Sequence, residues 1–250
     1  MAGKLYLVGI GPGSREHITP RAVEAIERSD VVVGYRSYLK QVEDLLSGKQ
    51  VLASGMRREV ERARRAVALA LQGRRVALVS SGDPGVYAMA SVVFEYLAEN
   101  RIELEVEVIP GITSALAAAA LLGSPLGNDF AVISLSDLLV PWSEIERRLE
   151  HAASADFVIV LYNPRSSKRS WQLDRARELV LGYRSRATPV GLVRNAYREG
   201  CEVEVTTLGE MDTSRADMLT TVIVGCSRSF IYAGRIITPR GYKNRYSLRD

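Results

Sequence analysis

Three glycine-rich segments, each directly after a run of apolar residues, are the parts of the sequence best suited to hold a ligand. They are residues 9–13 (GIGPG), 80–87 (SSGDPGVY) and 109–114 (IPGITS). If the apolar runs are strands of an open α/β sheet, the loops follow the carboxyl ends of those strands, where such sheets bind ligands. Small side chains let a flat ligand lie against the backbone, and we expect Asp83 and Thr113 to contact its hydroxyl or amino groups.

A dinucleotide is one ligand that glycine loops bind, but the first loop matches the fingerprint G-x-G-x-x-G only in part. Ser14 stands where the third glycine belongs, and Pro12 removes a backbone N–H from the turn. The second apolar run, 30–34, ends without the acidic residue that would bind a ribose hydroxyl. These departures disfavour an NAD-dependent oxidoreductase, and the absence of G-x-x-x-x-G-K-[ST] argues against a P-loop enzyme.

The sequence offers few residues for covalent or metal chemistry. Its two cysteines, Cys201 and Cys226, and its two histidines, His17 and His151, show no C-x-x-C spacing. We therefore expect neither a protein-bound metal nor a disulfide framework, and a reducing cytoplasm as the compartment. The sequence has no G-x-S-x-G motif and no histidine paired with cysteine or aspartate, so a nucleophilic triad is not expected.

The charge of the chain is carried mostly by arginine. There are 28 Arg against 5 Lys, with a net charge of +4, in a sequence whose 47% hydrophobic and 25% charged content is typical of a globular protein. The leading interpretation of the arginine excess is genomic or thermal background. The alternative is a polyanionic ligand, because the guanidinium group makes two-pronged contacts to carboxylate and phosphate.

Neither a nucleic acid nor a membrane is an expected partner. The segment 57–65 carries five arginines, but Glu59 and Glu61 lie among them, so it is interpreted as a solvated helix face. No apolar run approaches the roughly 20 residues of a membrane helix, and the start of the sequence does not have the pattern of a signal peptide. The five arginines are Arg57, Arg58, Arg62, Arg64 and Arg65.

The first half alternates between strand-like and helix-like patterns, which predicts a mostly parallel sheet with helices on both faces. Residues 103–109 alternate glutamate with apolar side chains, so this strand is expected at an edge of the sheet. Thr19 and Pro20 suit the N-cap and the first position of a helix. The predicted strands are 5–10, 30–34, 50–53, 75–80 and 103–109, and the predicted helices are 19–29, 38–46, 57–71 and 86–100.

The second half repeats this organisation after a small, apolar, uncharged segment at 110–127, which is interpreted as a buried helix and a turn that join two domains. We expect an α/β fold with an N-terminal domain at 1–116 and a C-terminal domain at 117–250. Residues 202–207 alternate cleanly, which is typical of an antiparallel or edge strand, and the tail from 235 is polar. The other predicted strands are 130–135, 156–162, 189–194 and 218–225, and the helices are 142–153 and 171–181.

Taken together, the glycine loops resemble motifs of the tetrapyrrole (corrin) methyltransferases, which are class III S-adenosylmethionine-dependent enzymes. The motifs are VGIGPG (8–13), GDPGVY (82–87) and PGITSALAAAALLGSPL (110–126). Two more, ISLSDLLVPW (133–142) and LYNPRS (161–166), are similar to those of members that methylate C-17 of precorrin-3B or cobalt-factor III in cobalamin biosynthesis. The resemblance covers essentially the whole chain. It implies a homodimer of two α/β domains with the cofactor in the cleft between them.

The resemblance implies which residues bind S-adenosylmethionine. Pro12 of the first loop is expected near cofactor and substrate. The second loop matches the one that contacts the methionine and ribose parts of the cofactor, the third loop matches the pair that follows the PG turn, and later segments match positions around the adenine. The family often has Asp where this chain has Ser14, which leaves the role of an acid there in doubt. The remaining candidates are Gly82, Asp83, Val86, Thr113 and Ser114 in the loops, and Tyr162, Asn163, Ala196 and Thr220 around the adenine.

For the substrate, the resemblance implies a macrocycle with many acetate and propionate groups, for which arginine is a suitable partner. Arg36, Arg165 and Arg169 lie beside the motifs and are the expected partners, with Ser134 also near the substrate and Trp142, Leu138 and Leu139 packed on the macrocycle. Methylation at C-17 is coupled in these enzymes to ring contraction, which needs proton transfers. The candidates for those transfers are Ser136, Asp137, Tyr35 and His17.

Several alternatives stay open at this point. The substrate is either the metal-free or the cobalt-bearing macrocycle, and cobalt would arrive only inside that substrate. The chain is alternatively a sibling that methylates another ring carbon, the diphthamide-forming methyltransferase of the same fold, or a nonenzymatic tetrapyrrole-binding module. Methyl transfer from a sulfonium needs alignment of donor and acceptor and exclusion of water rather than a metal or a nucleophile, which agrees with the scarcity of both in the sequence.

Overall fold

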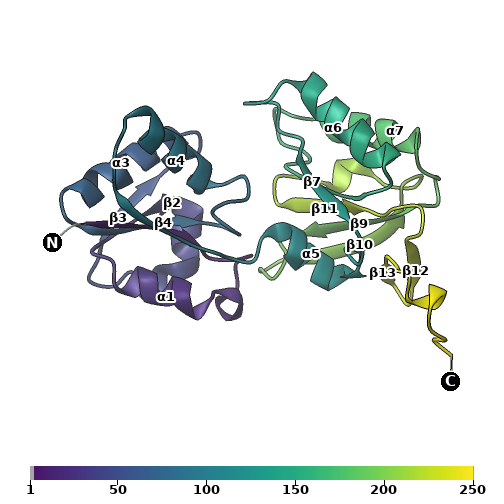
Figure 1. Ribbon diagram of the computed structural model, residues 1–250, viewed down its shortest axis with the longest axis horizontal. Coiled ribbons are helices and arrows are strands. Elements are labelled where there is room, and N and C mark those ends of the chain that lie inside the picture. Colours follow the sequence, from purple (N-terminus) through teal and green to yellow (C-terminus); the bar gives the residue numbers. More distant parts are fainter. Residues whose placement is uncertain (1–2, 250) are drawn as a thin grey trace. The chain divides into compact units, whose positions relative to one another are not determined.

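A computed structural model describes residues 3–249 of the chain (Figure 1). The chain divides into two compact units, Met1–Ser114 (unit 1) and Ala115–Asp250 (unit 2). Each unit contains its own five-stranded sheet flanked by helices, which confirms the predicted α/β class. The domain boundaries predicted at 1–116 and 117–250 stay a prediction, which limited proteolysis of the full chain would test.

Unit 1 contains a fully parallel sheet in the order β3-β2-β4-β1-β5. The central strands are continuous apolar runs because helices cover both of their faces. Leu5 and Leu7 of β1 pack with α3 and α4, whereas Tyr6 and Val8 pack with α1 on the other face (Figure 1). The strands are β1 Lys4–Gly9, β2 Val31–Tyr35, β3 Gln50–Ser54, β4 Arg75–Ser80 and β5 Glu105–Ile109, and the helices are α1 Pro20–Glu27, α2 Arg36–Leu39, α3 Glu59–Leu71 and α4 Met89–Glu99.

Helix α1 begins where its capping residue predicts, whereas two other helices of unit 1 depart from the prediction. Thr19 caps α1, since its hydroxyl accepts a hydrogen bond from Ala22 N at 3.2 Å. The helix predicted at 38–46 is wrong as a continuous helix, because α2 is followed by a 3₁₀ segment, Lys40–Leu45, in which Val42 has a non-helical φ of −130°. Helix α4 begins later than predicted because Tyr87 adopts a left-handed φ of 51°.

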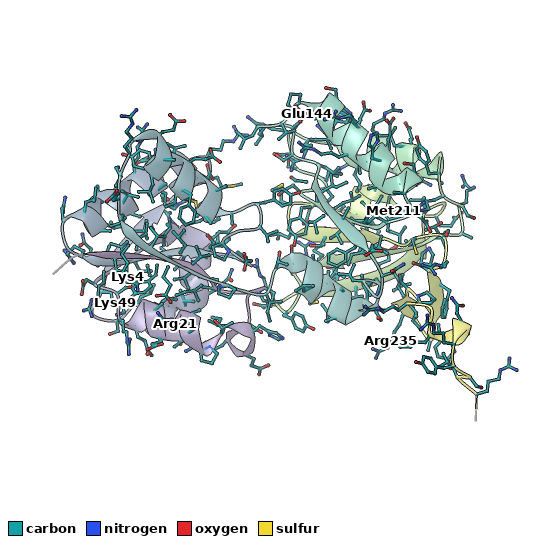
Figure 2. All side chains as sticks on the ribbon, in the orientation of Figure 1. Lys4, Arg21, Lys49, Glu144, Met211 and Arg235 are labelled. Atoms are coloured by element: carbon teal, nitrogen blue, oxygen red, sulfur yellow. The ribbon has the colours of Figure 1, made fainter. Side chains whose placement is uncertain are left out.

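The strand predicted at the edge of the first sheet is confirmed as β5, and its exposed side carries paired charges. Lys4 Nζ lies 2.7 Å from Glu105 Oε1 and 3.0 Å from Glu107 Oε2. Arg21 Nη2 lies 2.6 Å from Glu107 Oε1, and Figure 2 labels Lys4 and Arg21 in this unit. Charged side chains on an edge strand oppose pairing with a further strand.

Unit 2 contains a mixed sheet in the order β10-β9-β11-β8-β7, in which only β7 and β8 are parallel neighbours. Helices α6 and α7 cover one face, and their core includes Ile145, Leu149 and Met211 (Figure 2). Residues 202–207 form an antiparallel edge strand, as predicted. The elements are α5 Ser114–Leu122, β7 Phe130–Ser134, α6 Trp142–Ser154, β8 Val158–Tyr162, α7 Gln172–Leu181, β9 Pro189–Arg194, β10 Glu202–Thr207 and β11 Thr220–Val224.

A second, three-stranded sheet of unit 2 was not foreseen from the sequence. It has the order β12-β13-β6, with β6 Gly123–Ser124, β12 Phe230–Tyr232 and β13 Arg235–Ile237. The segment from residue 235 onward, which the sequence predicted only to be polar, therefore begins with a strand. Strands of two or three residues show too little alternation for a pattern of period two to reveal them.

Several arginines bond backbone carbonyls instead of facing solvent or a ligand. Arg62 is only 5% exposed, and its guanidinium donates to Gly55 O at 2.9 Å and to Ser54 Oγ at 2.7 Å. The interpretation of the helix 57–65 as a solvated arginine face is therefore wrong at Arg62. In unit 2, Arg177 donates to Leu208 O and Gly209 O at 2.8 and 2.5 Å.

Candidate functional site

The three glycine loops predicted to meet do meet, at the carboxyl edge of the unit 1 sheet. The strands β1, β4 and β5 are neighbours there, so the loops that follow them are neighbours too. Gly11 and Gly82 form an antiparallel bridge, in which Gly11 N donates to Gly82 O at 3.1 Å and Gly82 N donates to Gly11 O at 2.8 Å. The first and second loops are thus held backbone to backbone.

Glycine is required where these loops touch. A Cβ on Gly111 would lie 2.1 Å from Gly82 O and 2.8 Å from the carbonyl carbon of Gly9. A Cβ on Gly9 would lie within 2.8 Å of Gly82 O, Gly111 N and the Cδ of Pro84. The loops approach so closely that any side chain at these two positions would force them apart, so the glycines define a continuous surface of backbone.

Asp83 organises this surface. Its Oδ1 accepts a hydrogen bond from Gly85 N at 2.8 Å and its Oδ2 accepts one from Gly111 N at 3.0 Å, so one carboxylate joins the second and third loops. Sequence reasoning selected Asp83 for contact with a ligand and missed this structural role, because Gly111 lies 28 residues further along the chain. Val86 N donates to Asp83 O at 3.3 Å, which closes a tight turn in the same loop.

The other candidates of unit 1 lie at this same edge. Pro12 is buried within the first loop, and Thr113 and Ser114 are the last two residues of the third. Tyr35 ends β2 with its ring 5.1 Å from Tyr38 in an edge-on contact, and the next residue, Arg36, is exposed at the start of α2. The Nδ1 of His17 lies 2.5 Å from the hydroxyl of Ser14. Their contacts with a ligand stay predictions.

In unit 2 the predicted residues also gather at one edge of a sheet. Strands β7, β8 and β9 run in the same direction, whereas β10 and β11 run in the opposite direction. The ends of the first three strands and the start of β11 therefore share an edge. Ser134 and Tyr162 end β7 and β8, Asn163 follows at once, Ala196 lies in the loop after β9, and Thr220 begins β11.

A hydrogen-bond network links this edge. Asn163, in the left-handed region with φ of 52°, donates from Nδ2 to Ser134 Oγ at 3.0 Å, and the same oxygen accepts from Ser136 N at 3.2 Å. Tyr162 is buried, and its hydroxyl accepts a hydrogen bond from Ala115 N in the first turn of α5 at 2.7 Å. A non-glycine residue held at positive φ at a strand end is a common mark of a functional loop.

The loop after β7 presents polar and apolar groups in succession. Asp137 is exposed, and its Oδ2 accepts from Gln172 Nε2 at 3.0 Å. Leu138 and Leu139 are 66% and 95% exposed, so they are free of the protein core and available to an apolar ligand. Trp142 is half-buried at the start of α6, with its ring 4.8 Å from that of Trp171 in a T-shaped contact.

The two arginines predicted in the loop after β8 differ in their surroundings. Arg165 keeps a side chain that is 27% exposed, and its Nη1 lies 3.6 Å from Asp174 Oδ2 in a long ion pair. Arg169 is only 5% exposed and donates to protein atoms, among them Asn163 O at 3.1 Å. Burial lowers the pKa of the Arg169 guanidinium, against the opposing charge of Asp137. Arg169 is thus part of the protein scaffold instead of a surface group for carboxylates.

Asp217 supports the last candidate residue, Thr220. Burial alone would raise the pKa of Asp217, but hydrogen bonds from Arg194 Nε at 2.9 Å, Leu219 N at 2.8 Å and Thr220 Oγ1 at 2.9 Å lower this pKa below its ordinary value. Sequence reasoning did not select Arg194 or Asp217, since neither lies in a recognisable motif. Together they fix the start of β11 at the edge that carries Asn163.

We predict that Asp217→Asn lowers stability at neutral pH and has little effect in acid. Because the folded-state pKa is depressed, the contribution of Asp217 is fully present above the unfolded-state pKa of about 3.9 and is lost as pH falls through the folded-state value. The loss at pH 7 should be about 1 kcal/mol or less, since solvent screens a partly exposed pair. Urea unfolding at pH 7 and over a series of acid pH values that extends below the folded-state pKa of Asp217 measures it.

The matched control for Asp217→Asn is Glu202→Gln, which removes the other carboxylate near Arg194. Glu202 Oε1 lies 3.6 Å from Arg194 Nη1 and its side chain is 64% exposed, so its replacement should leave the urea midpoint unchanged at neutral and at acid pH. An Asp217→Asn effect of equal size at neutral and acid pH would contradict the assigned electrostatic origin.

No cluster of three or more histidine, cysteine or acidic side chains that could hold a metal occurs in residues 3–249. Over the same residues, no helix combines the length and the apolar character needed to cross a bilayer.

The chain belongs to the family of tetrapyrrole (corrin/porphyrin) methylases, whose model matches residues 4–212. The sheet edge of unit 1 that carries the three glycine loops, and the sheet edge of unit 2 that carries Asn163, are therefore features of a member of this family.

Two curated relatives have names that specify a reaction. One, a cobalt-factor III methyltransferase from Priestia megaterium, is 50% identical over all of this chain and 47% of its own length. Another, a probable cobalt-factor III C(17)-methyltransferase from Salmonella typhimurium, is 48% identical over 95% of this chain and 99% of its own length. The chain spans about half the length of the first two curated relatives, at 47% and 55%.

A solved structure, that of the methyltransferase CobJ, aligns with a TM-score of 0.91 at 37% identity and covers 95% of this chain and 100% of that one. The similarity extends through both units, in agreement with a resemblance over essentially the whole sequence. These findings confirm the predicted family resemblance and fold.

Proposed function

We propose that this chain transfers a methyl group from S-adenosylmethionine to C-17 of a corrin precursor, cobalt-factor III or precorrin-3B, in cobalamin biosynthesis. The observation that carries the proposal is the 48% identity to a relative of matching length whose name specifies that carbon. The backbone surface formed by the three glycine loops supports it, because a flat, polar cofactor needs such a surface.

The residues present suit S-adenosylmethionine, which supplies a methyl group on a positively charged sulfur. In unit 1, the loops ordered by Asp83 present backbone and small side chains for the methionine and ribose parts, at Pro12, Gly82, Val86, Thr113 and Ser114. In unit 2, Tyr162, Asn163, Ala196 and Thr220 are proposed to contact the adenine. A direct displacement asks of the protein that it align donor and acceptor and exclude water.

The loop 134–142 is proposed to face the macrocycle. Leu138 and Leu139 are proposed to present their exposed apolar surface to its ring, and Ser134 and Trp142 at the two ends of this loop are proposed to contact it too. Arg36 and Arg165 are proposed partners for its carboxylate side chains, since a charged guanidinium forms two-pronged bonds to such groups.

Ring contraction is the second part of the proposed reaction and requires proton transfer. Ser136 Oγ accepts a hydrogen bond from Arg169 Nη1 at 3.3 Å, which leaves its own hydrogen available for a substrate oxygen. Asp137, Tyr35 and His17 remain the other candidates. Single replacements of these four residues, with separate measurement of methyl transfer and of lactone formation, would identify which one moves the proton.

The protein is further proposed to be a cytoplasmic homodimer. The family resemblance supports this, and so does the exposed apolar strand β12, in which Phe230, Ile231 and Tyr232 are each more than 40% exposed. Light scattering coupled to gel filtration would measure the mass of the assembly in solution.

The deciding experiment combines binding and turnover. Calorimetry with S-adenosylhomocysteine should show tight binding, and incubation with S-adenosylmethionine and either macrocycle should yield a product with one additional methyl group, located at C-17 by NMR.

Absence of binding would overturn the proposal. A methyl group at another carbon would identify a sibling activity, and macrocycle binding without transfer would identify a binding module. The ratio of kcat/KM for the two macrocycles would settle the substrate.

We predict that Arg165→Ala weakens macrocycle binding and leaves cofactor binding intact. Loss of a charge-assisted hydrogen bond of about 1.5 kcal/mol should raise the KM for the macrocycle about tenfold. The matched control is Lys168→Ala, which removes an exposed charge from the same loop and should change neither constant. The assignment is wrong if Arg165→Ala alters the affinity for S-adenosylhomocysteine equally, or alters neither affinity.

A further inference from the structure

Arg169 ends a tight turn in the loop after β8. Ser166 N donates to Arg169 O at 2.8 Å and Arg169 N donates to Ser166 O at 3.1 Å, so residues 166–169 are closed by two backbone hydrogen bonds. The turn directs the Arg169 side chain back across its own loop, where its Nε donates to Asn163 O at 3.1 Å. The backbone of Asn163, in its left-handed conformation, is therefore anchored by a side chain six residues later.

The same guanidinium reaches two more segments of unit 2. Its Nη1 donates to Ser136 Oγ at 3.3 Å, in the loop after β7. Its Nη2 lies 3.1 Å from Met218 Sδ, two residues before Thr220 at the start of β11. One side chain thus joins the loop proposed to face the macrocycle with both segments proposed to face the adenine.

The surroundings of Arg169 are like those of Arg62 in unit 1, which is also 5% exposed and bonds a carbonyl, a hydroxyl and a methionine sulfur. The Arg169 side chain is nearly buried, and in the part of the chain that the structure describes no carboxylate lies within 4.0 Å of it. A buried cation that bonds only neutral acceptors costs free energy, so an apolar side chain would suit stability alone equally well. The planar fork of a guanidinium is what three separate acceptors need, and lysine does not supply it.

We propose that Arg169 is a positioning residue. It fixes the loop that contains Asn163, the loop that contains Ser136 and the start of β11 in one arrangement, so the affinity for the cofactor and the affinity for the macrocycle both depend on it. This inference rests on the proposed function. It assigns Arg169 no contact with either ligand, in contrast to Arg165, whose replacement should affect the macrocycle alone.

The test compares Arg169→Lys with Arg177→Lys in the full chain. Arg177 is a matched control because it also anchors backbone carbonyls in unit 2, those of Leu208 and Gly209, but touches none of the three segments. Arg169→Lys should weaken S-adenosylhomocysteine binding and raise the KM for the macrocycle, each about fivefold or more, a size typical of coupled neighbours. Arg177→Lys should lower the Tm and leave both constants unchanged.

A second variant keeps the inference testable if Arg169→Lys folds poorly. Met218→Leu removes only the sulfur acceptor and should weaken S-adenosylhomocysteine binding by a smaller factor, with Tm within a few degrees of the unaltered protein. The inference is overturned if Met218→Leu binds as the unaltered protein does, or if folded Arg169→Lys behaves like Arg177→Lys. Failure of the unaltered protein to bind S-adenosylhomocysteine would instead overturn the proposed function.

Discussion

Gly111→Ala is expected to abolish binding of S-adenosylhomocysteine and to lower the free energy of unfolding by about 3 kcal/mol, the upper part of the range for overpacking a close contact. The added Cβ would lie 2.1 Å from Gly82 O and 2.9 Å from Gly9 O, and both atoms belong to the backbone. Neither can move aside as the end of a side chain can. The second and third loops must separate, and the hydrogen bond from Gly111 N to Asp83 Oδ2 would be lost with them.

The matched control for this change is Gly55→Ala, the same substitution in a loop of the same unit. A Cβ on Gly55 meets nothing within 4 Å, so stability and ligand binding should be unchanged. Calorimetry with S-adenosylhomocysteine and urea unfolding measure the two effects. Wild-type affinity in Gly111→Ala would show that the glycine-loop surface is not where the cofactor binds.

Arg184→Met is expected to lower the free energy of unfolding by about 2 kcal/mol, because it removes a buried guanidinium that bonds two carbonyls and one partly exposed carboxylate. The Arg184 side chain is 4% exposed, and its Nη1 lies 2.9 Å from Asp156 Oδ1. The guanidinium also donates to Ala153 O at 2.5 Å and to Phe157 O at 3.1 Å, which ties the end of α6 to the start of β8. The variant would leave two carbonyls and a carboxylate without this donor.

Arg175→Met is the matched control for Arg184. Arg175 forms an ion pair of similar length, 2.8 Å to Glu146 Oε1, but its side chain is 45% exposed. Its loss should cost less than about 1 kcal/mol, because this guanidinium is exposed to solvent and bonds side-chain carboxylates, Glu146 and Glu178, in place of buried carbonyls. Equal losses of stability in the two variants, measured by urea unfolding, would contradict the decisive role given to burial.

The sequence predicted the strands of the two five-stranded sheets well, because a short apolar run bounded by turn residues is typical of a buried strand. The convergence of the three loops followed from the rule that parallel strands share an edge for their carboxyl ends. The break of the helix at Val42 and the short strands β12 and β13 escaped prediction. Strands of three residues are too short to show an alternating pattern, and the apolar spacing at 38–46 does not record the non-helical φ of Val42.

The candidate site was likewise predicted in part and missed in part. Motif spacing selected Asn163 and Ser134, which the structure joins by a hydrogen bond. It did not separate Arg165 from Arg169, two arginines four residues apart, of which only one is exposed enough to meet a ligand. That difference arises from Ser136 and Met218, which lie 33 and 49 residues away from Arg169, so no local pattern could contain it.

Because several arginines bond backbone carbonyls, different parts of the molecule are expected to respond differently to acid. The bonds from Arg62 and Arg177 to backbone carbonyls involve no carboxylate or imidazole, which are the groups that gain a proton in acid. Contacts made by carboxylates, such as those of Asp217, weaken as pH falls. Acid should therefore loosen the start of β11 while the loops that Arg62 and Arg177 anchor still hold.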